Sequence, residues 1–152
     1  MEAKIIKLHS ETHISALDSG SNRLCLHARL DGPVLLAPGA RKLIPTGIAL
    51  ALPTSTEAHI RPRRDLAVEC GVTILDAPCI VSSGDLSEIE VLLINLGEKG
   101  VSIKPGMAIA DLSIVATIPL TPQTAEHSIA HKATHLNPDM GLDLQLEVMS
   151  LG

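Results

Sequence analysis

The sequence predicts an all-β domain, and three observations support this prediction. Short apolar runs separated by Gly, Pro, Asp, Asn or Ser recur about every ten residues, a spacing typical of a sandwich or barrel of short strands. Residues 57–61 and 102–104 alternate between polar and apolar with a period of two, which indicates strands that bury one face. Before the C-terminal third, the only helical pattern is the short segment 66–70.

Each predicted strand is an apolar run bounded by turn residues. We expect strands over residues 5–8, 24–28, 34–36, 41–45, 48–52, 58–62, 73–75, 80–81, 89–95, 101–103 and 109–115. The turns contain Pro, which fixes φ, and Gly, which permits a positive φ. Residues 92–94 are apolar on both faces and therefore indicate a central strand or a subunit interface.

The chain length predicts one main domain followed by a tail. With 152 residues, 45% of them hydrophobic, the chain can bury one sizeable core but not two. We expect a β-barrel domain over residues 1–120 and a tail over residues 121–152. In the tail, Thr124 is suited to cap a helix that continues to about residue 133. The strict alternation over residues 142–148 indicates a strand.

The composition excludes several classes of function. The net charge is −5 and the chain contains no Phe, Tyr or Trp, so it lacks both the basic surface and the stacking rings of a nucleic-acid binder. No apolar run approaches the roughly 20 residues that a membrane helix requires. Three cysteines without C-x-x-C spacing, behind a start with no secretory pattern, predict a reduced cytoplasmic protein.

Four segments carry a resemblance to a known family. They are APGARKLIPTGIALALP at 37–53, EAHIRPR at 57–63, GVTILDAP at 71–78 and IKPGMAIADL at 103–112. With these segments the chain resembles the trimeric dUTPases (deoxyuridine triphosphate nucleotidohydrolases), in a registration from about residue 5 to residue 118. The resemblance implies a dUTPase-like jelly roll, a distorted β-barrel of the β-clip type with one short helix. It also implies a homotrimer with sites between subunits and an exchanged C-terminal segment, so that the tail packs on a neighbouring subunit.

The positions that the resemblance marks as catalytic carry other side chains. Cys25 stands in place of the acidic residue of the first motif, and Asp85 replaces the tyrosine that packs against deoxyribose. Ser82 replaces the aspartate that activates water. A serine hydroxyl has no basicity near neutral pH, and general base catalysis contributes about 10²–10⁴-fold. By resemblance, therefore, no catalytic position is intact.

Five residues are candidates for substrate binding because they lie in or beside the motifs. They are Arg63, Arg64, Asp76, Glu88 and Asp111. Arg63 and Glu88 match the family pattern. Arg64 replaces a phosphate-binding serine, and Asp111 replaces an amide with an anion that repels phosphate. The Gly-rich fifth motif has no counterpart in residues 137–146.

Three histidines in the tail form a further pattern. His127, His131 and His135 stand four residues apart, which on a helix places three imidazoles along one face. Such a face is most simply a solvated surface. It is also a candidate site for Zn²⁺ or Ni²⁺, or a pH-sensitive contact in the trimer.

Two other arrangements remain open. The carboxylates of the motif loops are either solvated or form a rearranged Mg²⁺ site. They are Asp65, Asp76, Asp85, Glu88 and Asp111. A triad of Ser82, His59 and an aspartate is formally available but lacks any elbow motif.

The sequence therefore predicts a pseudoenzyme, a dUTPase-fold homotrimer that has lost hydrolysis and serves as a binding, regulatory or assembly protein. We expect no cofactor, and the partners are further copies of the chain and either a nucleotide or a protein. The alternative is an active, Mg²⁺-dependent dUTP diphosphatase that releases dUMP and pyrophosphate, or a related nucleotide pyrophosphatase with a rearranged acidic site.

Overall fold

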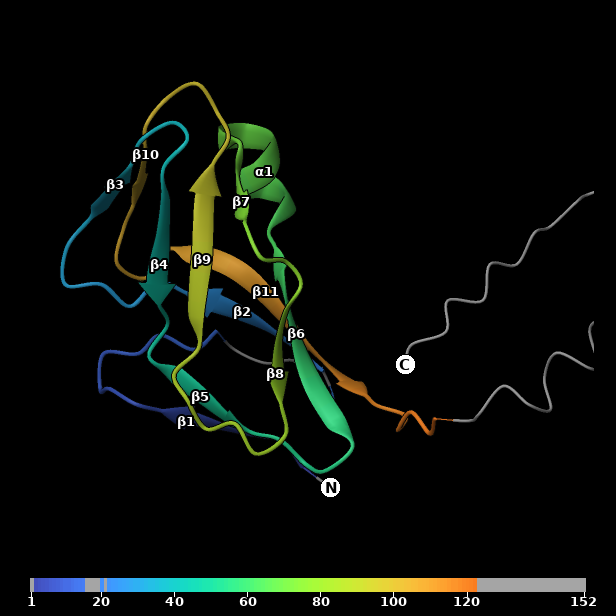
Figure 1. Cartoon of the computed structure of the whole chain (residues 1–152). Coiled ribbons are helices and arrows are strands. Elements are labelled where there is room, and N and C mark those ends of the chain that lie inside the picture. Colours follow the sequence, from blue (N-terminus) through green and yellow to red (C-terminus); the bar gives the residue numbers. More distant parts are fainter. Residues whose placement is uncertain (1, 16–19, 21, 123–152) are drawn as a thin grey trace, which may run out of the picture. The chain divides into compact units, whose positions relative to one another are not determined.

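The computed structural model describes residues 2–15, 20 and 22–122, and this part of the chain forms eleven strands and one helix (Figure 1). The elements are β1 (Lys4–Lys7), β2 (Arg23–His27), β3 (Val34–Leu36), β4 (Arg41–Pro45), β5 (Ile48–Ala51), β6 (Thr56–Pro62), α1 (Arg64–Cys70), β7 (Val72–Ile74), β8 (Cys79–Ser82), β9 (Glu90–Asn95), β10 (Val101–Ile103) and β11 (Ala108–Ala116). The all-β prediction with one short helix is confirmed.

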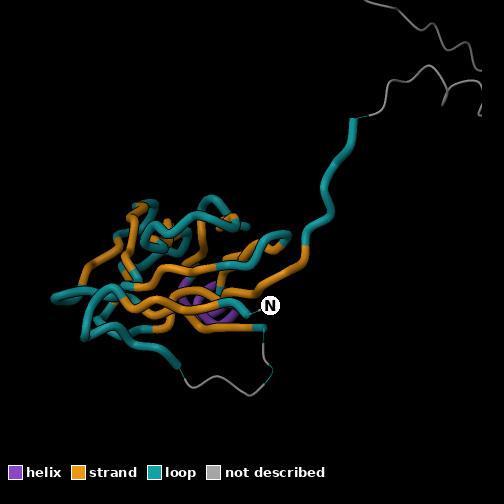
Figure 2. Tube along the Cα trace, turned by 90° about the horizontal axis from the view of Figure 1, so that it is seen from below, coloured by secondary structure: helices purple, strands orange, loops and turns teal. Residues whose placement is uncertain are grey.

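The strands form two larger sheets and two short ribbons, all with antiparallel pairing. The larger sheets have the strand orders β2-β11-β6-β8 and β4-β9-β7, and the ribbons pair β1 with β5 and β10 with β3. In the views of Figures 1 and 2 the three-stranded sheet and the four-stranded sheet lie as two layers. The strands come from distant parts of the sequence, so the layers hold the domain together by long-range pairing.

An aliphatic core fills the space between the layers. The four-stranded sheet contributes Leu24, Leu26, Ile60 and Leu112, and the opposite sheet contributes side chains such as Leu93; each is at most 6% exposed. Alternation along each strand places the intervening polar residues on the outer face. Leu, Ile and Val side chains from the two sheets thus fill a core that contains no aromatic residue.

The predicted strands agree with the structure to within two residues at each end. Strand β9 is central in its sheet, and Leu92 and Ile94 are half-buried on its second face, as its apolar sequence indicates. The helix begins at Arg64, two residues before the predicted start, and ends at Gly71, whose φ of 71° provides a left-handed C-cap.

The C-terminal predictions lie outside the described residues. Residues 123–152 contain the predicted helix from Thr124, the alternating segment 142–148 and the three-histidine pattern. The chain divides into two units, Met1–Pro119 and Leu120–Gly152. The domain boundary at residue 120 and the packing of the tail remain predictions. Within the described residues, no helix is long and apolar enough to span a membrane.

Candidate functional site

The outer face of the four-stranded sheet carries a row of polar side chains. In the antiparallel ladders, Glu57 of β6 lies opposite Ser82 of β8, and Arg61 lies opposite Asp111 of β11. Cys25 of β2 lies opposite Asp111 on the other side of β11. Side chains directly opposite one another share a face of the sheet. Two of the four segments that carry the resemblance, 57–63 and 103–112, therefore meet on this face.

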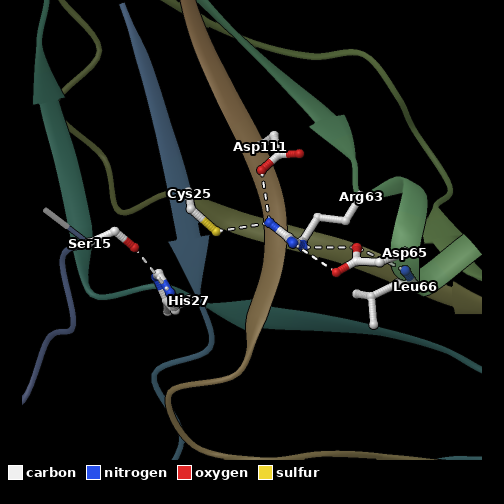
Figure 3. A network of polar contacts seen from close by, with 7 residues as sticks. All are labelled: Ser15, Cys25, His27, Arg63, Asp65, Leu66 and Asp111. Carbon is white, nitrogen blue, oxygen red and sulfur yellow. Dashed lines mark hydrogen bonds and ion pairs between the residues drawn. The ribbon is translucent and has the colours of Figure 1, made fainter. Parts of the chain in front are cut away.

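Arg63 organises one end of the row, immediately after β6 (Figure 3). Its Nη1 donates hydrogen bonds to Asp111 Oδ1 at 3.1 Å and to Cys25 Sγ at 3.2 Å. Its Nε and Nη2 donate to the two carboxylate oxygens of Asp65 at 3.1 and 2.8 Å. Asp65 Oδ1 also accepts from the backbone N–H of Leu66. We call Arg63, Cys25, Asp65 and Asp111 the arginine cluster.

The charged groups of the arginine cluster are paired with one another. The hydrogen bonds to Asp65 raise the pKa of Arg63, and the hydrogen bond from Arg63 is the main cause that lowers the pKa of Asp65. One cation thus faces two carboxylates, and the cluster carries a net negative charge when both are ionised. A nucleotide phosphate has to compete with these carboxylates for the guanidinium.

Cys25 does not substitute for the acidic residue that the family pattern places there. Burial raises the pKa of its thiol, and the opposing effect of Arg63 is smaller. The thiol therefore stays protonated near neutral pH and is a weak hydrogen-bonding group rather than an anion.

A second polar group lies at the other end of β6. Ser82, the last residue of β8, is exposed and lies opposite Glu57. Glu57 Oε1 is 2.6 Å from His59 Nε2, and both side chains are about 30% exposed, at 28% and 30%. The acidic partner of His59 is therefore Glu57 and not an aspartate, so the triad that was formally available in the sequence is not formed.

Within one chain, the arginine cluster and the polar group around Ser82 lie at opposite ends of β6 and do not form one site. Glu57 and Arg63 are six residues apart along an extended segment, which at 3.3 Å per residue corresponds to about 20 Å. Ser82 and the arginine cluster therefore cannot contact the same small ligand within one chain. A site that uses both needs a second subunit.

The remaining predicted residues are dispersed. Arg64 is exposed on the first turn of α1, and Asp76 is exposed in the turn between β7 and β8. Asp85 accepts the backbone N–H of Ser87 at 2.9 Å, an interaction that lowers the pKa of Asp85. Glu88 accepts the backbone N–H of Gly47 at 2.7 Å and so fastens the β8–β9 connection to the turn before β5.

The rearranged acidic metal site is not formed within the described part of one chain. No group of three or more His, Cys, Asp or Glu residues there could hold a metal ion. Asp65 and Asp111 converge on Arg63, whereas Asp85 and Glu88 bind backbone N–H groups. The carboxylates are spread over loops and engaged locally. The candidate metal ligands His127, His131 and His135 lie outside the described residues.

His27 is a buried titratable group beside the arginine cluster (Figure 3). It is 9% exposed, its Nε2 lies 3.3 Å from Ser15 Oγ, and its ring stacks edge-on against His13 at 4.3 Å between centroids. Within the described residues, its buried Nδ1 has no hydrogen-bond partner. Burial, followed by the proximity of His13, lowers the pKa of His27 below 6.5.

This lowered pKa predicts a loss of stability in mild acid. The unfolded chain binds a proton on this imidazole at a higher pH than the folded chain does, so the free energy of unfolding falls as the pH drops below about 6.5. We expect His27→Gln to flatten this slope in urea titrations between about pH 7 and pH 5. His9→Gln, at an exposed position, is the matched control and should preserve the slope. An unchanged slope in His27→Gln would contradict the assignment.

Two features of the outer face of the four-stranded sheet were not predicted from the sequence. The contact between Glu57 and His59 was detectable as an i, i+2 pair on a predicted strand, because such residues share one face. The burial of His27 was not detectable, because it depends on a loop that covers the end of β2.

Comparisons with known proteins identify the family to which this fold and these motifs are similar. The dUTPase family model matches residues 20–138. A deoxyuridine 5'-triphosphate nucleotidohydrolase from Ehrlichia canis is 39% identical over 117 residues, which is 76% of each chain. Those from Syntrophotalea carbinolica and Clostridium kluyveri are 37% and 49% identical, over 76% and 57% of their own lengths.

Solved structures agree on the fold. The dUTPase of Staphylococcus aureus phage phi11, studied as a D95N mutant with a structural Mg(II) ion, aligns with a TM-score of 0.72 at 12% identity, over 83% of this chain and 97% of that one. The dUTPase of EIAV aligns with a TM-score of 0.68 at 19% identity, over 81% and 95% of the chains. The jelly-roll scaffold implied by the motifs is thereby confirmed.

Proposed function

Because the chain belongs to the dUTPase family, we propose that it forms a homotrimer that cleaves dUTP to dUMP and pyrophosphate, at a rate limited by its altered site. The observation that carries this proposal is the family match over residues 20–138, which contains both Arg63 and the β8–β9 connection. The relatives at 37–39% identity over three quarters of the chain are named for hydrolysis of this nucleotide. The predicted cytoplasmic location is part of the same proposal.

The geometry of β6 supports the subunit assembly. Ser82 lies near the start of β6 and Arg63 just beyond its end, too far apart for both to contact one nucleotide in a single chain. In a closed trimer the Arg63 end of one subunit can face the Ser82 end of the next, because heterologous contacts that close generate a ring. Such an arrangement gives three equivalent sites.

Within that site, the contribution of the arginine cluster is to bind the nucleotide phosphates rather than to transfer a proton. Arg63 is the cation for the phosphates, and it becomes available when phosphate oxygens displace Asp65 or Asp111. Magnesium would offset phosphate charge during the reaction. The described residues of one chain do not form a group that could hold this ion.

A second candidate is a trimer that binds a nucleotide or protein partner without hydrolysis. Two observations favour it: the hydroxyl of Ser82 at the position of the water-activating carboxylate, and the commitment of Arg63 to two carboxylates. The two candidates differ in whether pyrophosphate is released.

Pyrophosphate release from dUTP and Mg²⁺ tests the proposal. We expect slow turnover by the full chain and at least about tenfold faster turnover by Ser82→Asp, because a positioned carboxylate base contributes about 10²–10⁴-fold in all. Ser83→Asp adds the same charge one residue further along the exposed turn and serves as the matched control.

The outcomes separate the candidates. Faster release by Ser82→Asp but not by Ser83→Asp supports the family reaction with a missing base. Absence of release from both the natural chain and Ser82→Asp, at enzyme concentrations where a tenfold enhancement would be visible, favours the non-hydrolysing trimer and rejects the first candidate.

A further inference from the structure

We propose that His59, held by Glu57, is the general base that deprotonates the attacking water in this chain, in place of the carboxylate absent at position 82. This inference rests on the proposed dUTP cleavage and names the group that performs its proton transfer. It concerns the end of β6 opposite to the arginine cluster.

The sheet register places His59 beside Ser82. Ser82 lies opposite Glu57, and Ile80 lies opposite His59, so His59 and Ser82 are diagonal neighbours across the β6–β8 ladder. Diagonal neighbours are separated by about 7–8 Å, which is within reach of long and aromatic side chains. A water molecule over Ser82 is therefore within reach of the imidazole through a short displacement of the ring.

The contact with Glu57 selects the nitrogen that accepts the proton. Glu57 Oε1 accepts from His59 Nε2 at 2.6 Å, so the neutral ring carries its proton on Nε2 and its lone pair on Nδ1. Among the described residues, the side-chain hydrogen bond of His59 is the one that Nε2 makes with Glu57, which leaves Nδ1 for a water molecule. A carboxylate behind an imidazole fixes its tautomer and stabilises the imidazolium that forms during the reaction.

The neighbouring charges are compatible with this role. On β6 the flanking outward groups are Glu57 and Arg61, and Arg61 donates to Ser113 Oγ at 3.1 Å. The facing and diagonal positions are Ile80 and Ser82 on β8, and Ser113, Asp111 and Val115 on β11. Two carboxylates are therefore near His59: Glu57 contacts its ring, and Asp111 accepts a hydrogen bond from Arg63. The developing positive charge on His59 is paired directly with Glu57.

The proposed step balances in atoms and charge. His59 Nδ1 takes a proton from water as the water oxygen bonds to the α-phosphorus. The bond between that phosphorus and the oxygen bridging to the β-phosphorus breaks, and pyrophosphate leaves with the electron pair. The imidazolium then releases its proton to solvent, which restores the neutral ring beside Glu57.

His59→Gln tests the proposal in the full chain, with dUTP and Mg²⁺ and detection of pyrophosphate. We expect at least about a tenfold loss in kcat, as for removal of a general base, with little change in KM. His9→Gln, the matched control at an exposed position, should leave turnover unchanged. Glu57→Gln should also lower kcat, because it removes the anion that supports the imidazolium.

A double variant distinguishes catalysis from structure. With a carboxylate restored by Ser82→Asp, the imidazole is no longer the base, so His59→Gln in that background should have little effect on kcat. An equal loss in both backgrounds would show a structural effect and overturn the proposal. Unchanged turnover in the single His59→Gln variant would also overturn it while leaving dUTP cleavage intact. Failure of the natural chain and of Ser82→Asp to release pyrophosphate would instead reject the proposed function itself.

Discussion

Replacement of Asn95 by Ala is expected to lower the free energy of unfolding by about 3 kcal/mol, because three backbone groups, one of them in a fully buried contact, lose their partner. The Asn95 side chain is fully buried at the end of β9. Its Nδ2 donates to the carbonyl oxygens of Leu36 at 2.9 Å and Lys99 at 2.8 Å, and its Oδ1 accepts the N–H of Gly97 at 2.9 Å. This one amide thus joins β3 to the connection between β9 and β10.

Urea denaturation at one fixed protein concentration measures this effect, because stability depends on concentration in an oligomer. Asn22→Ala is the matched control. Asn22 is exposed, and within the described residues its side chain donates one hydrogen bond, to the carbonyl oxygen of Ile114 at 3.1 Å, so its loss should cost no more than about 1 kcal/mol. Equal losses in the two variants would show that the Asn95 network contributes nothing beyond an ordinary surface bond.

Leu26→Ala is the second change with a large expected effect, a loss of about 2–5 kcal/mol. Leu26 is fully buried on β2 and packs in the core, while its neighbours Cys25 and His27 point to the outer face. Removal of its isobutyl group leaves a cavity that flanking strands can only partly fill. Because β2 carries Cys25, movement of this strand should also disturb the arginine cluster.

The measurement is again the urea midpoint and slope. Leu35→Ala on β3 deletes the same atoms from a side chain that is 71% exposed, and its effect should stay within about 0.5 kcal/mol. If Leu26→Ala were as mild as Leu35→Ala, the two-layer core would not depend on β2 as described.

The arginine cluster bears directly on the choice between the two candidate functions. Cys25 and Asp111, which by resemblance replace residues of the family pattern, bind Arg63 together with Asp65. Their substitutions therefore form a connected set in space. A phosphate ligand has to replace carboxylates at Arg63, which predicts weaker nucleotide binding than a free guanidinium would provide.

The sequence predicted the strands with little error because their signals are local. The alternation over residues 57–61 reports which side chains of β6 face the core, and the turn at Gly106, with a φ of 75°, reports where β11 begins. The resemblance then predicted the barrel, because the four segments that carry it coincide with strands and turns of the scaffold. The short helix was also found, apart from its first two residues.

Of the two arrangements that the sequence left open for the motif-loop carboxylates, the acidic metal site is not formed within the described residues of one chain, because nearness in sequence does not provide nearness in space. Asp65 and Asp111 lie 46 positions apart yet share one guanidinium. Asp85 and Glu88, only three positions apart, bind different backbone groups. Local sequence indicates which residues are acidic, whereas strand pairing decides which of them meet.

Patterns within the sequence were sufficient to predict the all-β class, the succession of strands along the chain and the resemblance to the family. The pairing of Arg63 with two carboxylates, the contact of Glu57 with His59 beside Ser82, and the separation of the two ends of β6 became apparent from the folded chain alone. This difference arises because periodicity and turns act over a few residues. Hydrogen bonds and ion pairs between strands depend instead on register, which pairings across the whole chain set together.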